Sequence, residues 1–273
     1  MVRRYFQLQW LYVKMDLAAL LRDTKFMLIC VTADVFMSAS AMFGIFLLAW
    51  RFDGIGGLDR YEVLFMLALA GLVYGVICML DHGNASVPSR IIGRGQWEHM
   101  FIMPLSFRMQ MLVGFSPFTC SGSFISGLVM LCVAVVNLTL PWWWLPMLVG
   151  YVLLSMVILV GLSYLVSTLA FYAPVQCEEI SSTLLYSMEH TATFPLSGMP
   201  VYIKAPLLTV LPAGLVAWLP TLLILGHAPA WVHVYPVLLA AVILLAATFA
   251  FKKGFRYYVK KGINRYHPGG HRC

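Results

Sequence analysis

Long apolar runs separated by short polar connectors dominate the chain. Residues 109–177 contain no Asp, Glu, Lys, Arg or His, whereas a soluble domain averages about one charged residue in four. A helix needs about 20 apolar residues to cross the hydrocarbon core of a bilayer, so this stretch can hold two crossings and a turn. Three Trp residues at 142–144 mark the turn, because Trp favours the membrane–water interface. The chain is therefore predicted to be an integral membrane protein.

The apolar pattern predicts an all-α membrane fold with six transmembrane helices. The expected spans are 26–50, 61–81, 109–139, 143–172, 176–198 and 233–251. Residues 1–25 combine apolar side chains at helical spacing with basic ones, which is typical of an amphipathic helix lying in the membrane interface. A solvated leader is the alternative interpretation. Residues 1–273 are expected to form a single transmembrane domain.

The fifth span has two interpretations. In the first, 176–198 crosses the membrane and 203–226 dips in from the outside as a broken re-entrant segment. In the second, 205–226 is the crossing and the residues before it are cytoplasmic. The first is favoured, because three prolines within 205–226 remove backbone donors and disfavour a straight helix. Irregular backbone at membrane depth is tolerated where protein or a cavity surrounds it.

The distribution of basic residues predicts the orientation. Of the 18 Lys and Arg residues, 15 fall on the side that holds both termini and the loop 82–108. Lys and Arg are retained on the cytoplasmic side, so both termini are expected there, with 252–273 as a basic cytoplasmic tail. The net charge of +7 forms no basic face on a folded domain, so nucleic-acid binding is not expected. The predicted location is the inner or plasma membrane.

Motifs for catalysis, metal binding and nucleotide binding are absent from the sequence. It contains no GxxxxGK[ST] loop, no HExxH and no CxxC. Neighbouring acidic and His residues, such as Glu98 and His99, point to different faces of a helix and cannot bind one metal as i, i+4 residues can. We therefore expect no catalytic residue, no metal ligand and no directly bound cofactor.

A short helix with one apolar face is predicted within the cytoplasmic loop 82–108. Gly93 and Gly95 permit a sharp turn before it, and Pro104 ends it. Its apolar face, at spacing i, i+3, i+4, consists of Trp97, Met100 and Phe101. Such a helix either lies on the membrane or docks into a groove on a cytoplasmic partner, and the residues alone do not decide between the two.

Charged residues within the expected spans form a second candidate site. If 176–198 crosses the membrane, Glu189 and His190 lie at depth, where a lone charge costs about 2.5–3.5 kcal/mol on insertion scales. They should then face a protein interior or a water-filled path, and Asp34 in the first span has the same requirement. Under the other topology Glu189 is a solvated cytoplasmic residue. Gly71 and Gly75 have the GxxxG spacing that lets two helix backbones approach closely.

Four stretches, in order along the chain, resemble a known family. They are GGLDRYEVL at 56–64, IGRG at 92–95 through MPLS at 103–106, FPLS at 194–197 with Pro212 and PTLLILG at 220–226, and FKKGFRYY at 251–258. Together they resemble the permease subunit of an ABC-2 type exporter, in the six-span subfamily that has a separate ATPase. Each motif is loose, and their order and spacing carry most of the resemblance.

The resemblance implies a dimer of permease subunits, identical or paralogous, each contacting an ABC ATPase that binds ATP and Mg. The chain itself would not be an enzyme. The implied ATPase-contacting coupling helix comprises Arg94, Gly95, Gln96, Trp97, Glu98, Met100, Phe101 and Pro104. The implied substrate pathway includes Tyr186, Glu189 and His190.

Four points stay open at this stage. Glu178 and Glu179, near the cytoplasmic end of the expected fifth span, either bind the ATPase or are ordinary interface charges. A non-transporting membrane scaffold or assembly protein is the alternative function, and it would not need a coupling helix. An integral-membrane enzyme is a third hypothesis, for which the sequence offers no convergent polar residues. The sequence does not indicate which substrate is moved.

Overall fold

The computed structural model describes residues 2–81, 86–104, 110, 118 and 121–261. Every regular secondary-structure element in these ranges is a helix, as expected. In chain order they are α1 Val2–Arg22, α2 Thr24–Arg51, α3 Arg60–Asp81, α4 Pro88–Arg94, α5 Gln96–Ile102, α7 Gly122–Asn137, α8 Trp144–Ser167, η1 Thr168–Phe171, α9 Ile180–Ala192, α10 Val201–Thr209, η2 Ala213–Leu215, α11 Trp218–Ile224, η3 Ala230–His233 and α12 Val234–Lys261.

Helix α3 occupies the centre of the bundle, and its side chains from Val63 to Val73 are almost completely buried. Helix α7 packs against it at two glycines. A Cβ atom added to Gly71 would lie 2.9 Å from the Cα atom of Gly127, and one added to Gly75 would lie 2.4 Å from the backbone nitrogen of Phe124. The glycines therefore let the two backbones pack in direct contact. This contact lies within one chain.

Four helical segments are long and apolar enough to cross a membrane. They are Thr24–Arg51, Arg60–Met79, Trp144–Phe171 and Ala230–Lys261. They coincide with the expected spans 26–50, 61–81, 143–172 and 233–251. The chain is therefore a multi-pass membrane protein by the length and composition of its helices, and the total of six spans stays a prediction.

Within the expected span 109–139 the structure describes helix α7. Helix α7 has 16 residues, about 24 Å at 1.5 Å per residue. It begins at Gly122, whose backbone N–H donates a hydrogen bond of 2.8 Å to Asp34 Oδ2. A carboxylate at a helix N-terminus stabilises that end. Asp34 therefore favours the start of α7 at Gly122, although the apolar sequence extends further towards the N-terminus. Asp34 in turn gains a polar partner. Residues 109, 111–117 and 119–120 lie outside the described residues.

The two candidates for the fifth span are helical in part. Within 176–198, only the 13 residues of α9 form a helix, about 20 Å long, which is less than the hydrocarbon thickness of about 30 Å. The region 205–226 is not one straight helix, because α10 and the segment Ala213–Ile224 meet at 71°. This geometry is that of a broken span or a re-entrant loop.

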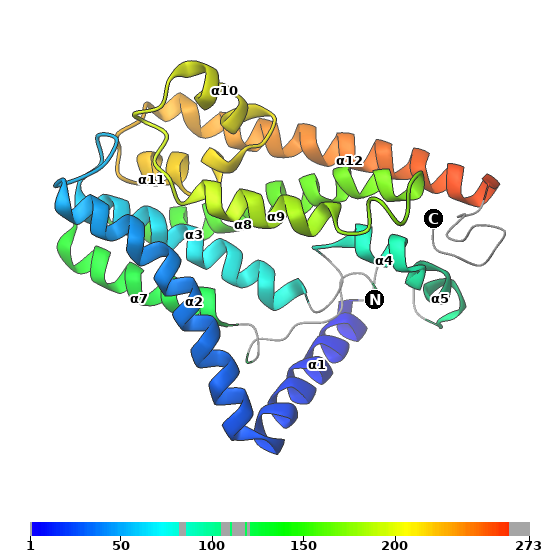
Figure 1. The fold of residues 1–273 in the computed structure, drawn as a ribbon. Helices are drawn as coiled ribbons and strands as arrows, with labels where there is room; N and C mark the ends of the chain where they lie inside the picture. The colour runs from blue at the N-terminus through cyan, green and yellow to red at the C-terminus, as the bar shows by residue number, and fades with distance from the viewer. Residues whose placement is uncertain (1, 82–85, 105–109, 111–117, 119–120, 262–273) are drawn as a thin grey trace.

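The connectors gather at the two ends of the bundle. Figure 1 shows α4, α5 and the C-terminal end of α12 at one end, and α10, α11 and the α2–α3 connector towards the other. Helix α1 and the first half of α2 diverge from the bundle as two arms of a V (Figure 1). In α2 the buried residues are Met42, Ile45 and Ala49, all in its second half.

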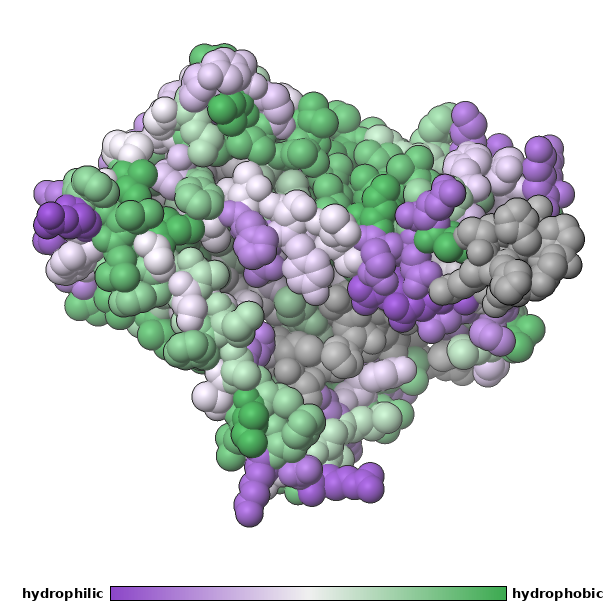
Figure 2. Space-filling view, viewed as in Figure 1, coloured by the Kyte–Doolittle hydropathy of each residue, from purple (hydrophilic) through white to green (hydrophobic). Residues whose placement is uncertain are grey.

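The surface is divided by polarity. Figure 2 shows hydrophobic side chains over α10 and α12 and again over α2 and α7, with a more hydrophilic band between them, where α9 lies. The band ends in strongly hydrophilic side chains close to α4 (Figure 2). A lipid-facing surface would be apolar throughout, so the α9 band has a different environment.

Candidate functional site

Helices α4 and α5 form a bent pair at the polar end of the bundle. Pro88 begins α4, where its missing N–H costs nothing. Gly95 separates the two helices in the left-handed conformation, with φ 70°, which glycine adopts without steric cost. A Cβ atom at Gly93 would lie 2.8 Å from the carbonyl oxygen of Pro174. Helix α4 therefore packs directly on the turn that precedes α9.

Trp97 anchors this pair to the rest of the protein. Its side chain is 2% exposed, and its ring centroid lies 5.7 Å from that of Phe171, 5.5 Å from that of Phe251 and 6.1 Å from that of Phe255. Met100 is buried in the same cluster. The apolar face predicted from the sequence is therefore split, because only Phe101, at 51% exposure, is open to a partner.

The other predicted coupling residues divide in the same way. Arg94, Gln96, Glu98 and Pro104 are exposed, whereas Gly95 is buried with Trp97 and Met100. The reason is long-range packing. The rings from η1 and α12 lie 70 or more residues away in sequence and cover the side of α5 that the helical spacing marks as apolar. The exposed apolar surface of this region is Phe101, Ile102 and Met103.

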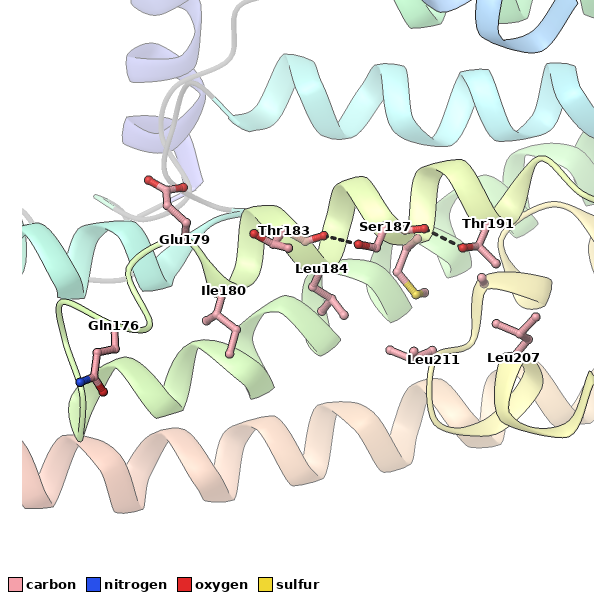
Figure 3. Close-up of a pocket in the computed structure, with 11 residues that line it drawn as sticks. Gln176, Glu179, Ile180, Thr183, Leu184, Ser187, Thr191, Leu207 and Leu211 are labelled. Carbon is pink, nitrogen blue, oxygen red and sulfur yellow. Dashed lines mark hydrogen bonds between the residues drawn. The ribbon is translucent and has the colours of Figure 1, made fainter. Parts of the chain in front are cut away.

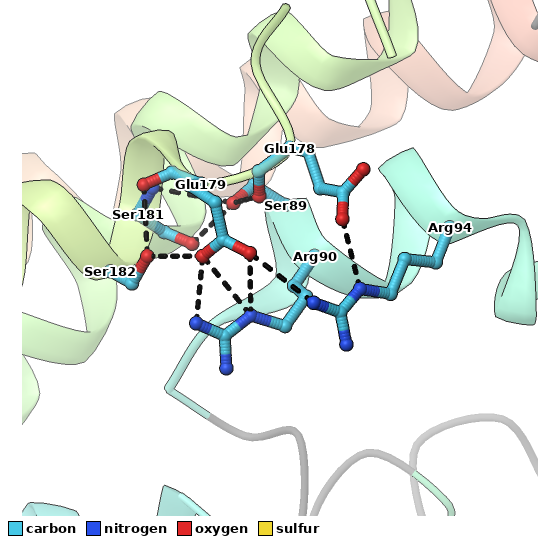
Figure 4. Close-up of polar contacts among 7 residues, drawn as sticks. All are labelled: Ser89, Arg90, Arg94, Glu178, Glu179, Ser181 and Ser182. Atoms are coloured by element: carbon cyan, nitrogen blue, oxygen red, sulfur yellow. Dashed lines mark hydrogen bonds and ion pairs between the residues drawn. The ribbon is translucent and has the colours of Figure 1, made fainter. Parts of the chain in front are cut away.

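Two arginines of α4 bind two glutamates that precede α9 (Figure 4). Arg90 Nη2 lies 2.7 Å from Glu179 Oε2, and Arg90 Nε donates to both carboxylate oxygens at 3.1 Å. Arg94 Nε donates to Glu178 Oε1 at 2.9 Å. Ser89 Oγ adds a hydrogen bond of 2.7 Å to the carbonyl oxygen of Glu178. We call Ser89, Arg90, Arg94, Glu178 and Glu179 the Arg–Glu cluster.

The Arg–Glu cluster is unequally exposed. The Glu178 side chain is 15% exposed and that of Glu179 is 47% exposed. Hydrogen bonds from Arg90 and from Ser182, at 2.7 Å, hold the pKa of Glu179 below its ordinary value. Both glutamates are thus occupied within the chain. They lie at an internal contact between α4 and the start of α9, and both roles left open by the sequence stay predictions.

A hollow of about 480 Å³ opens along one face of α9. Figure 3 shows the hydroxyl side chains of Thr183, Ser187 and Thr191 in a row on α9, with Leu207 and Leu211 across from them. Ser187 and Thr191 donate to backbone carbonyls one turn earlier in the helix. Their oxygen lone pairs therefore remain available as acceptors.

A second, smaller cavity of about 260 Å³ lies between α2 and α9. Its wall includes Glu189 and His190, two of the predicted pathway residues, together with Ser38 of α2. Ser38 Oγ lies 2.9 Å from Ser123 Oγ of α7. Tyr186, the third predicted residue, is 60% exposed and lines neither cavity. The structure thus brings Glu189 and His190 together and places Tyr186 apart.

Comparison with known proteins identifies the family. The family model described as ABC-2 family transporter protein matches residues 35–262. The chain belongs to the ABC-2 transporter family. No match was found among curated proteins or among solved structures. The chain is accordingly a permease-type membrane subunit, of a family that is generally non-catalytic and generally works with an ABC ATPase.

In this ABC-2 permease, no group of three or more His, Cys, Asp or Glu residues in the described ranges is placed to hold a metal ion.

The sequence reasoning missed Arg90, Ser38 and the hydroxyl row of α9. A usable signal was present for Arg90. It lies four residues before Arg94, on one helix face, which matches the adjacent pair Glu178–Glu179. Ser38 had no such signal, because its place in the cavity wall and its hydrogen bond to Ser123 depend on which helices pack against α2.

Proposed function

We propose that this ABC-2 permease is the transmembrane subunit of an ATP-driven exporter and couples its substrate pathway to a separate ATPase. The observation that carries the proposal is the Arg–Glu cluster, which joins the α4–α5 pair to the start of α9. The ATPase, with ATP and Mg bound to it, would contact the exposed surface of α5 formed by Phe101, Ile102 and Met103. Both chain termini and α4–α5 would be cytoplasmic, in line with the basic residues.

The cluster provides a mechanical connection. Bidentate Arg–carboxylate pairs fix orientation as well as distance, and Arg90 and Arg94 lie one helical turn apart. Trp97 holds the other side of the pair against α12. A displacement of α5 by the ATPase would therefore move α4 and the first turn of α9 together. Because α9 lines both cavities, ATP-driven closure of the ATPases would shift the population between two arrangements of the pathway.

The α9 band favours a second permease subunit. Thr183, Tyr186 and Ser187 are exposed, and polar groups in a spanning region avoid lipid. A second copy or a paralogous permease that covers this band would remove it from lipid and enclose the hollow of about 480 Å³. The substrate pathway would then lie between two subunits, along α9.

The first test is purification of the full chain from its native membrane in mild detergent, followed by mass spectrometry of the copurifying proteins. An ABC ATPase at about equal stoichiometry supports the exporter. A second six-span chain indicates a heterodimer. A folded permease without any ATPase overturns the proposal and favours a scaffold or assembly protein.

The second test addresses coupling. Exchange of charges at one pair, Arg94→Glu with Glu178→Arg, should restore what either single change removes, namely substrate stimulation of the ATPase in the reconstituted complex. The single variants should still bind the ATPase, because neither Phe101 nor its neighbours change. If both single variants keep full stimulation, the Arg–Glu cluster does not transmit the movement.

A further inference from the structure

The cavity of about 260 Å³ between α2 and α9 differs from a packing defect, because charged and apolar side chains share its wall. The lining residues are Ser38, Ala41, Met42, Ile45, Glu189, His190, Thr193 and Phe194. We propose that this cavity binds a small amphipathic cation. Its positive group would lie on the Glu189 carboxylate and its apolar part against Met42, Ile45 and Phe194. The inference rests on the proposed function, since it names the substrate class of the same exporter.

Glu189 forms no ion pair in the part of the chain that the structure describes, although His190 interacts with it electrostatically. None of the ion pairs or hydrogen bonds found there involves its side chain. His190 is its neighbour in sequence, but successive side chains on a helix point about 100° apart, and the two form no ion pair. A partly buried carboxylate without an ion pair is unfavourable, so a bound cation would stabilise it.

The charged residues around the cavity favour a ligand of positive charge. Asp34, one turn before Ser38, interacts electrostatically with Glu189 and is also negative. Between Lys25 and Arg51 helix α2 has no Lys or Arg, and α9 has none at all. The hydroxyl of Tyr74 is buried, has no hydrogen-bond partner among the described residues and lies within electrostatic reach of Glu189. His190, which also lines the cavity, acts on Glu189 with the opposite sign, but the two carboxylates and the lack of Lys and Arg on these stretches make the local field more favourable for a cation than for an anion.

The size and the apolar wall narrow the ligand further. Pockets for drug-sized ligands begin at roughly 300 Å³, so a cavity of about 260 Å³ suits a single head group with a short apolar extension. Aromatic rings attract quaternary ammonium groups through their negative faces, and Phe194 supplies a ring. The larger hollow on the other side of α9 is a weaker candidate, because its carboxylate, Glu179, is already bound by Arg90.

The test is calorimetric titration of the full chain in nanodiscs of zwitterionic phospholipid, with empty nanodiscs as the blank. The probes are benzyltrimethylammonium and benzylsulfonate, which share an apolar ring and have opposite charges. We expect saturable binding of the cation and none of the anion. Equal binding of both probes, or binding of neither, overturns the inference. This comparison uses the unmodified chain and does not depend on how a variant folds.

Variants locate the site. Glu189→Gln should weaken cation binding at least tenfold, whereas Glu189→Asp should keep the preference for the cation. Asp53→Asn is the matched control, because it removes a carboxylate that is 84% exposed and does not line the cavity. Unchanged binding in a Glu189→Gln chain that elutes as the unmodified protein would refute the assignment. No ATPase is present in this titration, so its failure is distinguishable from failure of the copurification test.

Discussion

Replacement of Trp97 by Ala tests whether this side chain anchors α5 inside the protein or contacts the ATPase. The side chain is 2% exposed and contacts rings from η1 and α12. Burial of this kind makes Trp→Ala cost about 3–5 kcal/mol. The cluster lies at the polar end of the bundle, where the segments Trp144–Phe171 and Ala230–Lys261 end, and we take the value measured in water-soluble proteins as the order of magnitude there. We expect the loss to appear as local opening of α4–α5.

Hydrogen exchange read by mass spectrometry measures that opening. At about 1.4 kcal/mol per tenfold, the loss corresponds to roughly hundred- to several-thousand-fold faster exchange in peptides covering 88–102. Phe101→Asp is the matched comparison. Phe101 is 51% exposed, so its replacement should leave exchange within about tenfold of the unmodified chain and instead weaken ATPase copurification.

One result would refute this reasoning. If Trp97→Ala abolished ATPase copurification while α4–α5 kept its normal exchange, Trp97 would face the ATPase and the cluster with Phe251 and Phe255 would not exist in the complex. Retained ATPase binding together with fast exchange would support the internal anchor.

Two further predictions follow from packing and charge. Gly75→Leu should destabilise the purified protein by about 1–3 kcal/mol or more, because backbone atoms of Phe124 occupy the space; Gly150→Leu, where the space is open, should leave the melting temperature nearly unchanged. The lowered pKa of Glu179 means that its pair with Arg90 stabilises the first turn of α9 at neutral pH and loses that effect as pH falls through the lowered value. Glu179→Gln should remove this pH dependence from the hydrogen exchange of the first turn of α9. If the Glu179→Gln variant keeps the pH dependence, the ion pair with Arg90 is not its cause.

The extent of the apolar helices was largely predictable from sequence. Long uncharged runs bounded by charges placed four helices that the structure also contains, because the requirement for about 20 apolar residues is local. The start of helix α7 at Gly122 was not predicted, because it depends on a hydrogen bond to Asp34, 88 residues earlier. The break between α10 and α11 was anticipated from prolines, which act locally, whereas its angle of 71° depends on packing.

The candidate site was predictable only in part. Helical spacing identified Trp97, Met100 and Phe101 as apolar, but it could not tell which side of α5 the rest of the protein would cover. The acidic pair Glu178–Glu179 was visible in the sequence, and its partner Arg90 was not recognised because the connection spans 89 residues. Glu189 was found because an isolated charge in an apolar segment is conspicuous.

The central position of α3 has a consequence for biogenesis. During synthesis α3 emerges before α7 and α8, yet in the folded protein 83% of its most apolar window is buried inside the bundle. On leaving the translocon it is surrounded by lipid, and later helices must displace that lipid. Gly71 and Gly75 are then the docking point for a helix made about 50 residues later. Assembly of the bundle therefore waits on the arrival of α7, and a chain arrested before Gly122 would leave α3 without its partner.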